Sequence, residues 1–305
     1  MTKQKTIRRA ISCSGIGLHS GEEIRMRIIP APEGSGIVFV RTDLDALAIP
    51  ADPAHIVSTY LSTTIGAQGA TVQTVEHLLA AISAMEIDNL IVELDGAEVP
   101  VFDGSSAPFV SLLLEAGTKH QEKEKHFIKV TEPITVSEGG KYITIRPASS
   151  LTVSYHIDFD HPLISKQSYR YRHSCKTFIK EIAPARTFGF LKEVESLQAQ
   201  GLARGGSLEN AIVIGEDRIL NTQGLRFPDE FVRHKILDLV GDLSLLGASI
   251  QGEIDAFCSG HQLHTKLIRE ILEHQSSWKI SGAPIMRPRK APLSYKTASL
   301  LPLSS

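Results

Sequence analysis

Residues 229–246 read DEFVRHKILDLVGDLSLL, a stretch that would be apolar on nearly every face of a helix. A helix of this kind is expected to be buried in the core. Three polar side chains nevertheless follow one line along it, because His234, Asp238 and Asp242 are spaced four residues apart. Buried carboxylates are costly unless they are paired or bind a metal. The stretch therefore predicts either a buried His–Asp hydrogen bond with a salt bridge, or a metal site.

A second helix, expected over residues 74–86, favours the metal site. Its apolar residues recur at helical spacing, and Glu76 and His77 lie near its start. Alanines on the side of His77 would let another helix approach closely. One imidazole from this helix, with the imidazole and carboxylate of the other, gives a set of two histidines and one aspartate. Three protein ligands with one open position are typical of catalytic zinc, whereas structural zinc usually has four ligands.

Four other side chains near these helices carry acid–base or hydrogen-bonding groups. Glu76 adjoins His77 and could take a proton from a water molecule as a general base. Lys235 and Thr187 could stabilise a developing oxyanion, and His261, at a Ser-Gly-His turn between a strand and a helix, could face a cleft. Each also has an ordinary interpretation. Glu76 would then stabilise a helix N-terminus, and the others would be a solvated cation, a turn residue and a cap or surface residue.

The two halves of the chain repeat one order of elements. In each half, a helix with a histidine precedes a glycine-containing turn and a second helix. The step from His77 to His234 is 157 residues, and the step from Gly104 to Gly260 is 156. The sequence therefore predicts an α+β fold of two similar halves, each a sheet plus two helices, with the helices packed between the sheets. The two histidines would face each other across the interface, where ligand sites often lie.

The chain of 305 residues is long enough for two domains, each with its own core. We expect the first at residues 1–124 and the second at residues 125–278. The charged residues 119–125 would be the linker between them, or else a charged helix end. Residues 186–215, approximately, predict a small βαβ-type insert in the second domain. We expect the remaining tail, residues 279–305, to be disordered.

Strands are indicated by alternating apolar and polar residues, and helices by apolar residues at helical spacing. The expected strands are residues 22–30, 36–41, 89–94, 141–145, 152–159, 211–214 and 250–257. The expected helices are residues 74–86, 106–116, 229–246 and 263–273, with a short amphipathic helix around residues 191–197.

The composition excludes several functional classes. A net charge of -2 gives no indication of nucleic-acid binding. No export signal is readable, and no run approaches the roughly 18 apolar residues of a spanning helix, so membrane contact would be peripheral at most. Cys13, Cys175 and Cys258 are scattered, which fits a reducing compartment. We expect a cytoplasmic protein, and a monomer.

Six motifs occur in one order along the chain. They are GIGLHSG (15–21), TVEHL (74–78), DGSS (103–106), ARTFGF (185–190), FVRHKILD (231–238) and SGH (259–261). Together they resemble the family of UDP-3-O-acyl-N-acetylglucosamine deacetylases, which carry out the committed step of lipid A synthesis in Gram-negative bacteria. The resemblance covers roughly residues 1 to 275, and it implies removal of an acetyl group from an acylated UDP-amino sugar.

The resemblance also implies roles for the residues of the predicted metal site. One zinc ion would be bound by three ligands, and Fe(II) would suit a similar set. A general base and a general acid would act beside it. The implied ligands are His77, His234 and Asp238, the implied base is Glu76, and the implied acid is His261.

Further roles follow from the same resemblance. Asp242 would hold His261 protonated, and Thr187 and Lys235 would stabilise the oxyanion. The insert would form a hydrophobic passage for the acyl chain, lined by Phe188, Leu191, Val194 and Val213. The uridine diphosphate would be contacted by Lys141, Asp158 and Phe159.

Two positions depart from the family pattern, and two other functions stay open. Cys258 stands where a basic residue near the pyrophosphate is expected, and Glu193 stands where an aspartate is expected. A different metal-dependent amidohydrolase would share the metal chemistry but need no acyl passage. A non-catalytic sugar-nucleotide or lipid binding protein would keep the pockets, although the retention of Glu76 argues against it.

Overall fold

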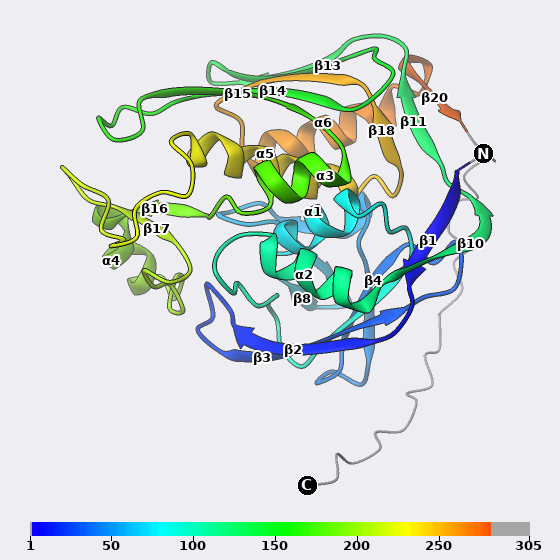
Figure 1. The fold of residues 1–305 in the computed structure, drawn as a ribbon, viewed down its shortest axis with the longest axis horizontal. Helices are drawn as coiled ribbons and strands as arrows, with labels where there is room; N and C mark the ends of the chain where they lie inside the picture. Colours follow the sequence, from blue (N-terminus) through cyan, green and yellow to red (C-terminus); the bar gives the residue numbers. More distant parts are fainter. Residues whose placement is uncertain (1, 282–305) are drawn as a thin grey trace, which may run out of the picture.

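The structure is a computed structural model that describes residues 2–281, and it consists of two five-stranded sheets with helices between them (Figure 1). This arrangement confirms the predicted α+β fold of two sheet-plus-helix halves. The predicted disorder of the tail is wrong for residues 279–281, which lie in β20 (Trp278–Ser281), and residues 282–305 lie outside the described residues.

The first sheet comes from the first half of the chain. Its neighbouring strands run antiparallel, except for a parallel pair between β9 and β4. In β3, Ile24, Met26 and Ile28 are buried whereas the residues between them are exposed, as in a sheet with one face on the core. The strand order is β2 (Ile11–Ile16), β3 (Glu23–Pro30), β9 (Leu90–Leu94), β4 (Ile37–Arg41) and β5 (Leu47–Pro50).

The second sheet repeats this topology. Its one parallel pair, β19 with β14, corresponds to β9 with β4, and its other pairs are antiparallel. The repetition supports the division into residues 1–124 and 125–278, which we propose as the two domains. The strand order is β12 (Ile134–Glu138), β13 (Lys141–Arg146), β19 (Glu253–Phe257), β14 (Thr152–Asp158) and β15 (Lys166–Arg172).

Four helices fill the layer between the sheets (Figure 1). They pack as the pairs α1–α5, α1–α2 and α5–α6. Gly117 ends α2 with a positive φ of 65°, a conformation that favours glycine. The helices are α1 (Glu76–Ala84), α2 (Ala107–Ala116), α5 (Glu230–Ser244) and α6 (His261–Glu273).

The contact between α1 and α5 is a close approach of two backbones. Ala80 and Ala81 of α1 are completely buried, and a Cβ atom added to Gly241 of α5 would overlap the carbonyl oxygen of Glu76. Small residues on both helices therefore permit this spacing. The helix predicted from residues 229–246 is buried, as its all-round apolar pattern indicated.

The insert leaves the second domain at one end of the molecule (Figure 1). It consists of β16 (Phe188–Phe190), α4 (Leu191–Ala199) and β17 (Ile212–Ile214), and the two strands are parallel. This is the βαβ order that the sequence indicated. Gly104 of the first domain packs against the insert, since a Cβ atom there would overlap the carbonyl oxygen of Asn210.

The predicted linker is wrong, because residues 119–125 lie almost entirely within a strand. β10 (Thr118–Glu124) pairs antiparallel with β1 (Lys3–Ile7), and Lys3 Nζ donates to the carbonyl of Glu122 at 2.6 Å. A two-stranded ribbon leaves charged side chains in solvent, so high charge does not exclude a strand here.

The strand expected at residues 250–257 is also divided. Gly252 separates β18 (Ser249–Gln251) from β19, and β18 joins another sheet with β11 (Phe127–Val130) and β20 (Trp278–Ser281). A Cβ atom at Gly252 would lie 2.9 Å from Ile145, so the chain turns where it has no side chain. The remaining short elements are β6 (Ile56–Ser58), β7 (Thr64–Ala67), β8 (Ala70–Val72), η1 (Pro53–His55), α3 (Cys175–Thr177), η2 (Phe178–Ile182) and η3 (Gln275–Ser277).

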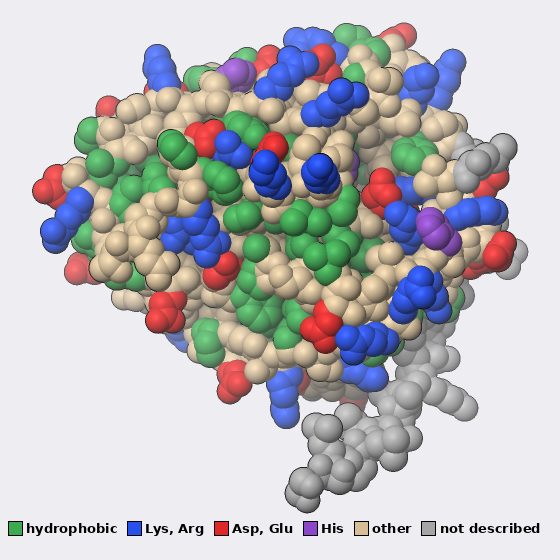
Figure 2. Space-filling model, viewed as in Figure 1, with side chains coloured by type: hydrophobic (Ala, Val, Ile, Leu, Met, Phe, Trp, Pro, Cys, Tyr) green, Lys and Arg blue, Asp and Glu red, His purple; other side chains and the backbone are tan. Residues whose placement is uncertain are grey.

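The surface is mixed in character on the face seen in Figure 2, with basic and acidic side chains interspersed among apolar ones. Among the described residues, no helix has both the length and the apolar character needed to cross a membrane.

Candidate active site

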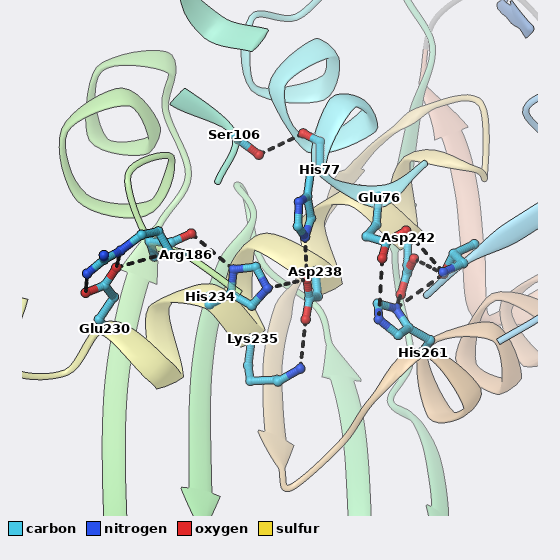
Figure 3. Close-up of polar contacts among 12 residues, drawn as sticks. Glu76, His77, Ser106, Arg186, Glu230, His234, Lys235, Asp238, Asp242 and His261 are labelled. Atoms are coloured by element: carbon cyan, nitrogen blue, oxygen red, sulfur yellow. Dashed lines mark hydrogen bonds and ion pairs between the residues drawn. The ribbon is translucent and has the colours of Figure 1, made fainter. Parts of the chain in front are cut away.

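The three predicted metal ligands meet between the two central helices (Figure 3). His77 comes from α1, whereas His234 and Asp238 are one turn apart on α5. Asp238 Oδ1 lies 3.2 Å from His234 Nε2 and 3.7 Å from His77 Nε2. The two imidazole rings are 5.0 Å apart and nearly perpendicular. Each of the three residues offers one ligand atom, and these three atoms lie within 4.8 Å of one another.

The surroundings of these three residues fit a divalent metal ion. All three are buried, and Asp238 Oδ1 has no hydrogen-bond partner among the described residues. His234 Nδ1 lies 3.1 Å from the carbonyl of Ala185 and can donate to it, which leaves the Nε2 lone pair for a metal. A buried, unpaired carboxylate oxygen beside two imidazoles is costly in a protein without a cation. The donor set suits zinc or another transition metal.

The protonation states suit metal binding as well. Burial lowers the pKa of His234 to about 3, so this imidazole is neutral near pH 7. Burial by itself raises the pKa of Asp238, but His234 and Lys235 outweigh burial and lower it well below its usual value. Metals bind neutral imidazole and ionised carboxylate, so no proton has to leave these two residues at neutral pH.

Lys235 lies at the edge of the metal site. Its Nζ donates to Asp238 Oδ2 at 2.9 Å and lies 5.4 Å from the centre of the Phe188 ring. Its ammonium group is therefore held close to the site, beside an aromatic ring of the insert. This position is compatible with the predicted contact to a developing oxyanion.

Glu76, the predicted base, faces the predicted acid across the site (Figure 3). Its Oε1 lies 3.8 Å from His261 Nε2, and its Oε2 accepts a hydrogen bond from the Thr63 backbone N–H at 3.1 Å. Burial raises the pKa of Glu76 above its usual range, although the neighbouring His261 opposes this shift. A carboxylate with a raised pKa is a stronger proton acceptor.

His261 is the first residue of α6 and is paired with Asp242 of α5. His261 Nδ1 lies 2.7 Å from Asp242 Oδ2, within hydrogen-bond distance. Burial lowers the pKa of His261, but the Asp242 carboxylate outweighs burial and raises it to about 9. Burial also raises the pKa of Asp242, but His261 and its hydrogen bond lower it to about 2. His261 is therefore an imidazolium at neutral pH.

The sequence did not predict two residues that contact Asp242 in its pair with His261. The Thr63 hydroxyl donates to Asp242 Oδ1 at 2.6 Å, and His264 Nδ1 lies 2.6 Å from Asp242 Oδ2. Asp242, His261 and His264 could also be chosen as a set of metal ligands. Here, however, the carboxylate oxygens already accept hydrogen bonds, whereas Asp238 Oδ1 does not. The set of His77, His234 and Asp238 is therefore the better candidate for a metal site.

Thr187 lies on the segment that leads into the insert. Its backbone N–H donates to the carbonyl of Gly104 at 2.8 Å, and its carbonyl accepts from Ile212 at 2.8 Å. The first of these bonds joins the two domains, and the second lies within the insert. The structure gives no contact between the Thr187 hydroxyl and the three predicted ligands, so its proposed role rests on its place two residues after Ala185.

A buried ion pair fixes the same segment to the start of α5 (Figure 3). Arg186 donates from Nε to Glu230 Oε1 at 2.8 Å and from Nη2 to Oε2 at 3.1 Å, and Glu230 is completely buried. Glu230 also accepts from the backbone N–H of Arg186 at 3.1 Å. This pair holds Ala185, whose carbonyl orients His234. No spacing in the sequence indicated it.

The predicted nucleotide-binding residues lie around one end of the second sheet. Asp158 and Phe159 line a cavity of about 850 Å³ with residues 160–162, Ser165 and Lys166. Phe159 lies 5.8 Å from the Phe188 ring, which connects this cavity to the metal site. The register places Lys141 at the same end of the sheet, because Tyr142 and His156 both pair with Phe257.

Cys258, the departure from the expected basic residue, packs against this end of the sheet. The Asp158 backbone N–H lies 3.2 Å from its Sγ atom. Cys258 thus contacts backbone, and the nearest cation paired with Asp158 is Lys166, whose Nζ lies 3.5 Å from Asp158 Oδ2.

The predicted acyl-passage residues belong to the insert. Phe188, Val194 and Val213 are half-buried, whereas the side chain of Leu191 is 48% exposed. Val213 pairs with Gly189, the residue after Phe188, so the side chains of Phe188 and Val213 lie on opposite faces of one small sheet. Apolar side chains that are left partly exposed in this way can contact an alkyl chain.

Comparison with known proteins gives consistent matches along the chain. A family model described as UDP-3-O-acyl N-acetylglycosamine deacetylase matches residues 4–273. The chain is 49% identical over 276 residues to a UDP-3-O-acyl-N-acetylglucosamine deacetylase of Syntrophus aciditrophicus, covering 90% of this chain and 88% of the relative. The protein of the same name from Myxococcus xanthus is 50% identical over 281 residues, covering 92% and 90%. That of Haemophilus influenzae is 47% identical over 283 residues, covering 92% and 93%.

Proposed function

The chain belongs to the UDP-3-O-acyl N-acetylglycosamine deacetylase family, and from this premise we propose how its residues carry out the reaction. The substrate is UDP-3-O-acyl-N-acetylglucosamine, and hydrolysis of its 2-acetamide gives a free amine and acetate, a step of lipid A biosynthesis. One observation supports the assignment of residues. Two imidazoles and a carboxylate oxygen without a hydrogen-bond partner lie close together beside the Glu76–His261 pair.

We propose that His77, His234 and Asp238 bind one zinc ion. Bound there, zinc would polarise the acetamide carbonyl and lower the pKa of a water molecule from about 16 toward about 7. Fe(II) suits the same ligands, and elemental analysis of the protein purified from its own cells would identify the bound metal. The hydrogen bond from His234 Nδ1 to Ala185 fixes the orientation of one ligand.

Glu76 acts as the general base in this proposal. It accepts a proton from the water molecule as the water oxygen attacks the carbonyl carbon of the acetamide. Its raised pKa strengthens it as a proton acceptor, and the hydrogen bond from Thr63 holds one of its oxygens. The other oxygen faces the site.

Lys235 and Thr187 stabilise the tetrahedral oxyanion that this attack forms. A cation and a hydroxyl donor held in place before the reaction stabilise developing charge without rearrangement. Lys235 is held by Asp238 and by the Phe188 ring, and Thr187 is held through its backbone.

His261 acts as the general acid. As an imidazolium, it gives the proton on Nε2 to the amine nitrogen, and the bond between this nitrogen and the carbonyl carbon breaks. Asp242 keeps His261 protonated until this step, because the pair shares a hydrogen bond of 2.7 Å. The proton taken by Glu76 and the proton given by His261 balance the hydrolysis.

We propose that the rest of the substrate lies along the path of aromatic and apolar residues that leads away from the metal site. The nucleotide would contact the cavity at the end of the second sheet, and the acyl chain would contact the insert. The proposed residues are Lys141, Asp158 and Phe159 for the nucleotide, and Phe188, Leu191, Val194 and Val213 for the acyl chain.

We further propose that the protein acts as a cytoplasmic monomer. Its cysteines, Cys13, Cys175 and Cys258, form no disulfide, as is usual in a reducing compartment. Size-exclusion chromatography with light scattering would measure the oligomeric state.

The function is tested by assaying acetate and free amine from two substrates. We expect zinc-loaded protein to release both products in equal amounts from UDP-3-O-acyl-N-acetylglucosamine, and to act far more slowly on UDP-N-acetylglucosamine, which lacks the acyl chain. Removal of the metal by a chelator should stop the reaction, and added zinc should restore it. Equal rates on the two substrates would favour a different metal amidohydrolase, and no acetate from either would overturn the function.

A further inference from the structure

One buried histidine beside the site has no role in the proposed reaction. His264 lies on α6, one turn after His261, and its side chain is completely buried. A polar side chain buried to this extent is costly unless its groups are paired, so its contacts show what it does.

Both ring nitrogens of His264 have partners. Nδ1 lies 2.6 Å from Asp242 Oδ2, the same oxygen that His261 Nδ1 contacts at 2.7 Å. Nε2 lies 3.3 Å from the hydroxyl of Ser259, and this hydroxyl lies 2.6 Å from that of Tyr155. Asp242 therefore accepts from two imidazoles at once, and one of them is connected to a buried hydroxyl pair.

The protons can be assigned from these contacts. Because Asp242 is ionised, each Nδ1 that contacts it carries a hydrogen. The Tyr155 hydroxyl lies 2.8 Å from the Ser259 carbonyl as well as 2.6 Å from the Ser259 hydroxyl, so it can donate to either oxygen. When Tyr155 donates to the Ser259 hydroxyl, that hydroxyl can donate to Nε2 of His264, which then carries no hydrogen. Burial lowers the pKa of His264, which favours this neutral form, in which His264 donates to Asp242 through Nδ1. His261 remains the single cation paired with Asp242.

We propose that His264 is a positioning residue for the deacetylation reaction, which acts by donating a hydrogen bond to Asp242 and so fixing this carboxylate toward His261. The Ser259–Tyr155 pair holds His264 in the required tautomer. The proposal rests on the role of His261 as general acid given above.

A neutral donor to Asp242 also affects how strongly the pair holds its proton. The hydrogen bond from His264 stabilises the carboxylate charge, so Asp242 attracts the His261 proton less than it would alone. Loss of this bond should raise the pKa of His261. The other groups facing His261 are Glu76 on α1 and Asp238 on α5, and Tyr155 on β14 is neutral because burial raises its pKa.

The test compares His264→Phe with His264→Asn in the zinc-loaded enzyme. Phenylalanine fills the space without a donor, whereas the asparagine amide places a donor close to the position of the histidine Nδ1. For His264→Phe we expect kcat to fall about tenfold or more and the basic limb of the pH profile to move up by about one unit. KM should change less than roughly twofold, since no substrate contact is removed. His264→Asn should restore most of kcat and the original basic limb.

A second measurement uses the unaltered protein, so it does not depend on whether His264→Phe folds. Nitrogen NMR of histidine-labelled, zinc-loaded protein should show His264 as a neutral ring with hydrogen on Nδ1 from pH 6 to 8. A hydrogen on Nε2, or a cation, would overturn the proposal. So would a lowered kcat in His264→Phe with an unchanged basic limb, or an asparagine variant that behaves like the phenylalanine variant.

Failure of the general-acid assignment would give a different result. If His261→Ala kept the basic limb, the acid would lie elsewhere, and the function of His261 would have to be revised. The NMR state of His264 and the His261 titration in His264→Phe would still report on the hydrogen bond to Asp242. The two failures are therefore distinguishable.

Discussion

The backbone of Gly241 lies directly against the carbonyl oxygen of Glu76, so that the two central helices are in contact at the residue before the first proposed ligand. α1 carries Glu76 and His77, and α5 carries the other two proposed ligands. The spacing of the helices thus sets the distance between groups that must act together.

Gly241→Ala should therefore disturb the metal site without altering any ligand. The added methyl group would overlap Glu76 and push α1 away from α5, at a cost of about 1–3 kcal/mol in the free energy of unfolding. We expect substoichiometric zinc by elemental analysis and a kcat/KM lowered at least about tenfold. Gly189→Ala is the control for zinc content and for the free energy of unfolding, because no atom lies within 4 Å of its added Cβ. A fully metallated, active Gly241→Ala protein would show that the spacing is not critical.

Ligand and base can be separated by two substitutions. Asp238→Ala should abolish stoichiometric zinc, because it removes one of three ligands. Glu76→Gln should keep the zinc and lower kcat by about two to four orders of magnitude, because the amide accepts no proton. Elemental analysis and steady-state kinetics check both. Loss of zinc from Glu76→Gln alone would mean that the ligand and the base have been confused.

The pH dependence of kcat/KM should be bell-shaped. Activity should rise as Glu76 loses its proton, at a pH above the usual range of a glutamate, because burial raises this pKa. Activity should fall as His261 loses its proton near pH 9. Rates measured across this range in constant ionic strength test both limbs. His261→Ala should remove the descending limb.

Thr63→Val removes the hydroxyl that donates to Asp242 and keeps the backbone N–H that holds Glu76. We expect kcat to fall about tenfold, in line with the strength of a hydrogen bond to a charged group, and zinc to stay bound. Thr265→Val is a matched control on the neighbouring helix, because its buried hydroxyl has no partner among the described residues. Equal values of kcat for the two variants would show that the Thr63 hydroxyl does not contribute to the reaction.

Glu230→Ala should destabilise the protein strongly. It leaves the buried Arg186 guanidinium without its carboxylate, which typically costs about 3–5 kcal/mol. Denaturant unfolding measures this change. The control is Glu253→Ala, which removes the partner of the largely exposed Arg170 and should cost about 0–1 kcal/mol. Similar losses for both would mean that Arg186 finds another partner.

The main features of the site could be predicted from sequence because each left a local pattern. A helix that is apolar all round but carries His234 and Asp238 has to bury them, and burial of a carboxylate demands a cation or a partner. The short insert was indicated by its own amphipathic helix. The repeated step between His77 and His234 indicated that two similar halves would meet there.

Other features left no such pattern. Thr63 and Asp242 are 179 residues apart, and only the folded chain brings them together. His264 follows His261 at helical spacing, which could have placed the two on one face, but nothing in the sequence showed that both would reach Asp242. The charged side chains of β10 resemble a solvated segment and so predict a linker, whereas the strand is ordered by backbone pairing with β1.

The matched topology of the two sheets makes the molecule comparable to a dimer of unlike subunits fused in one polypeptide. In a dimer of identical subunits, any substitution appears twice, so both sides of a symmetric cleft must carry the same side chains. Fusion removes that restriction. One half can carry a carboxylate before its histidine and the other a carboxylate four residues after it, so the proton acceptor and the third metal ligand come from opposite sides.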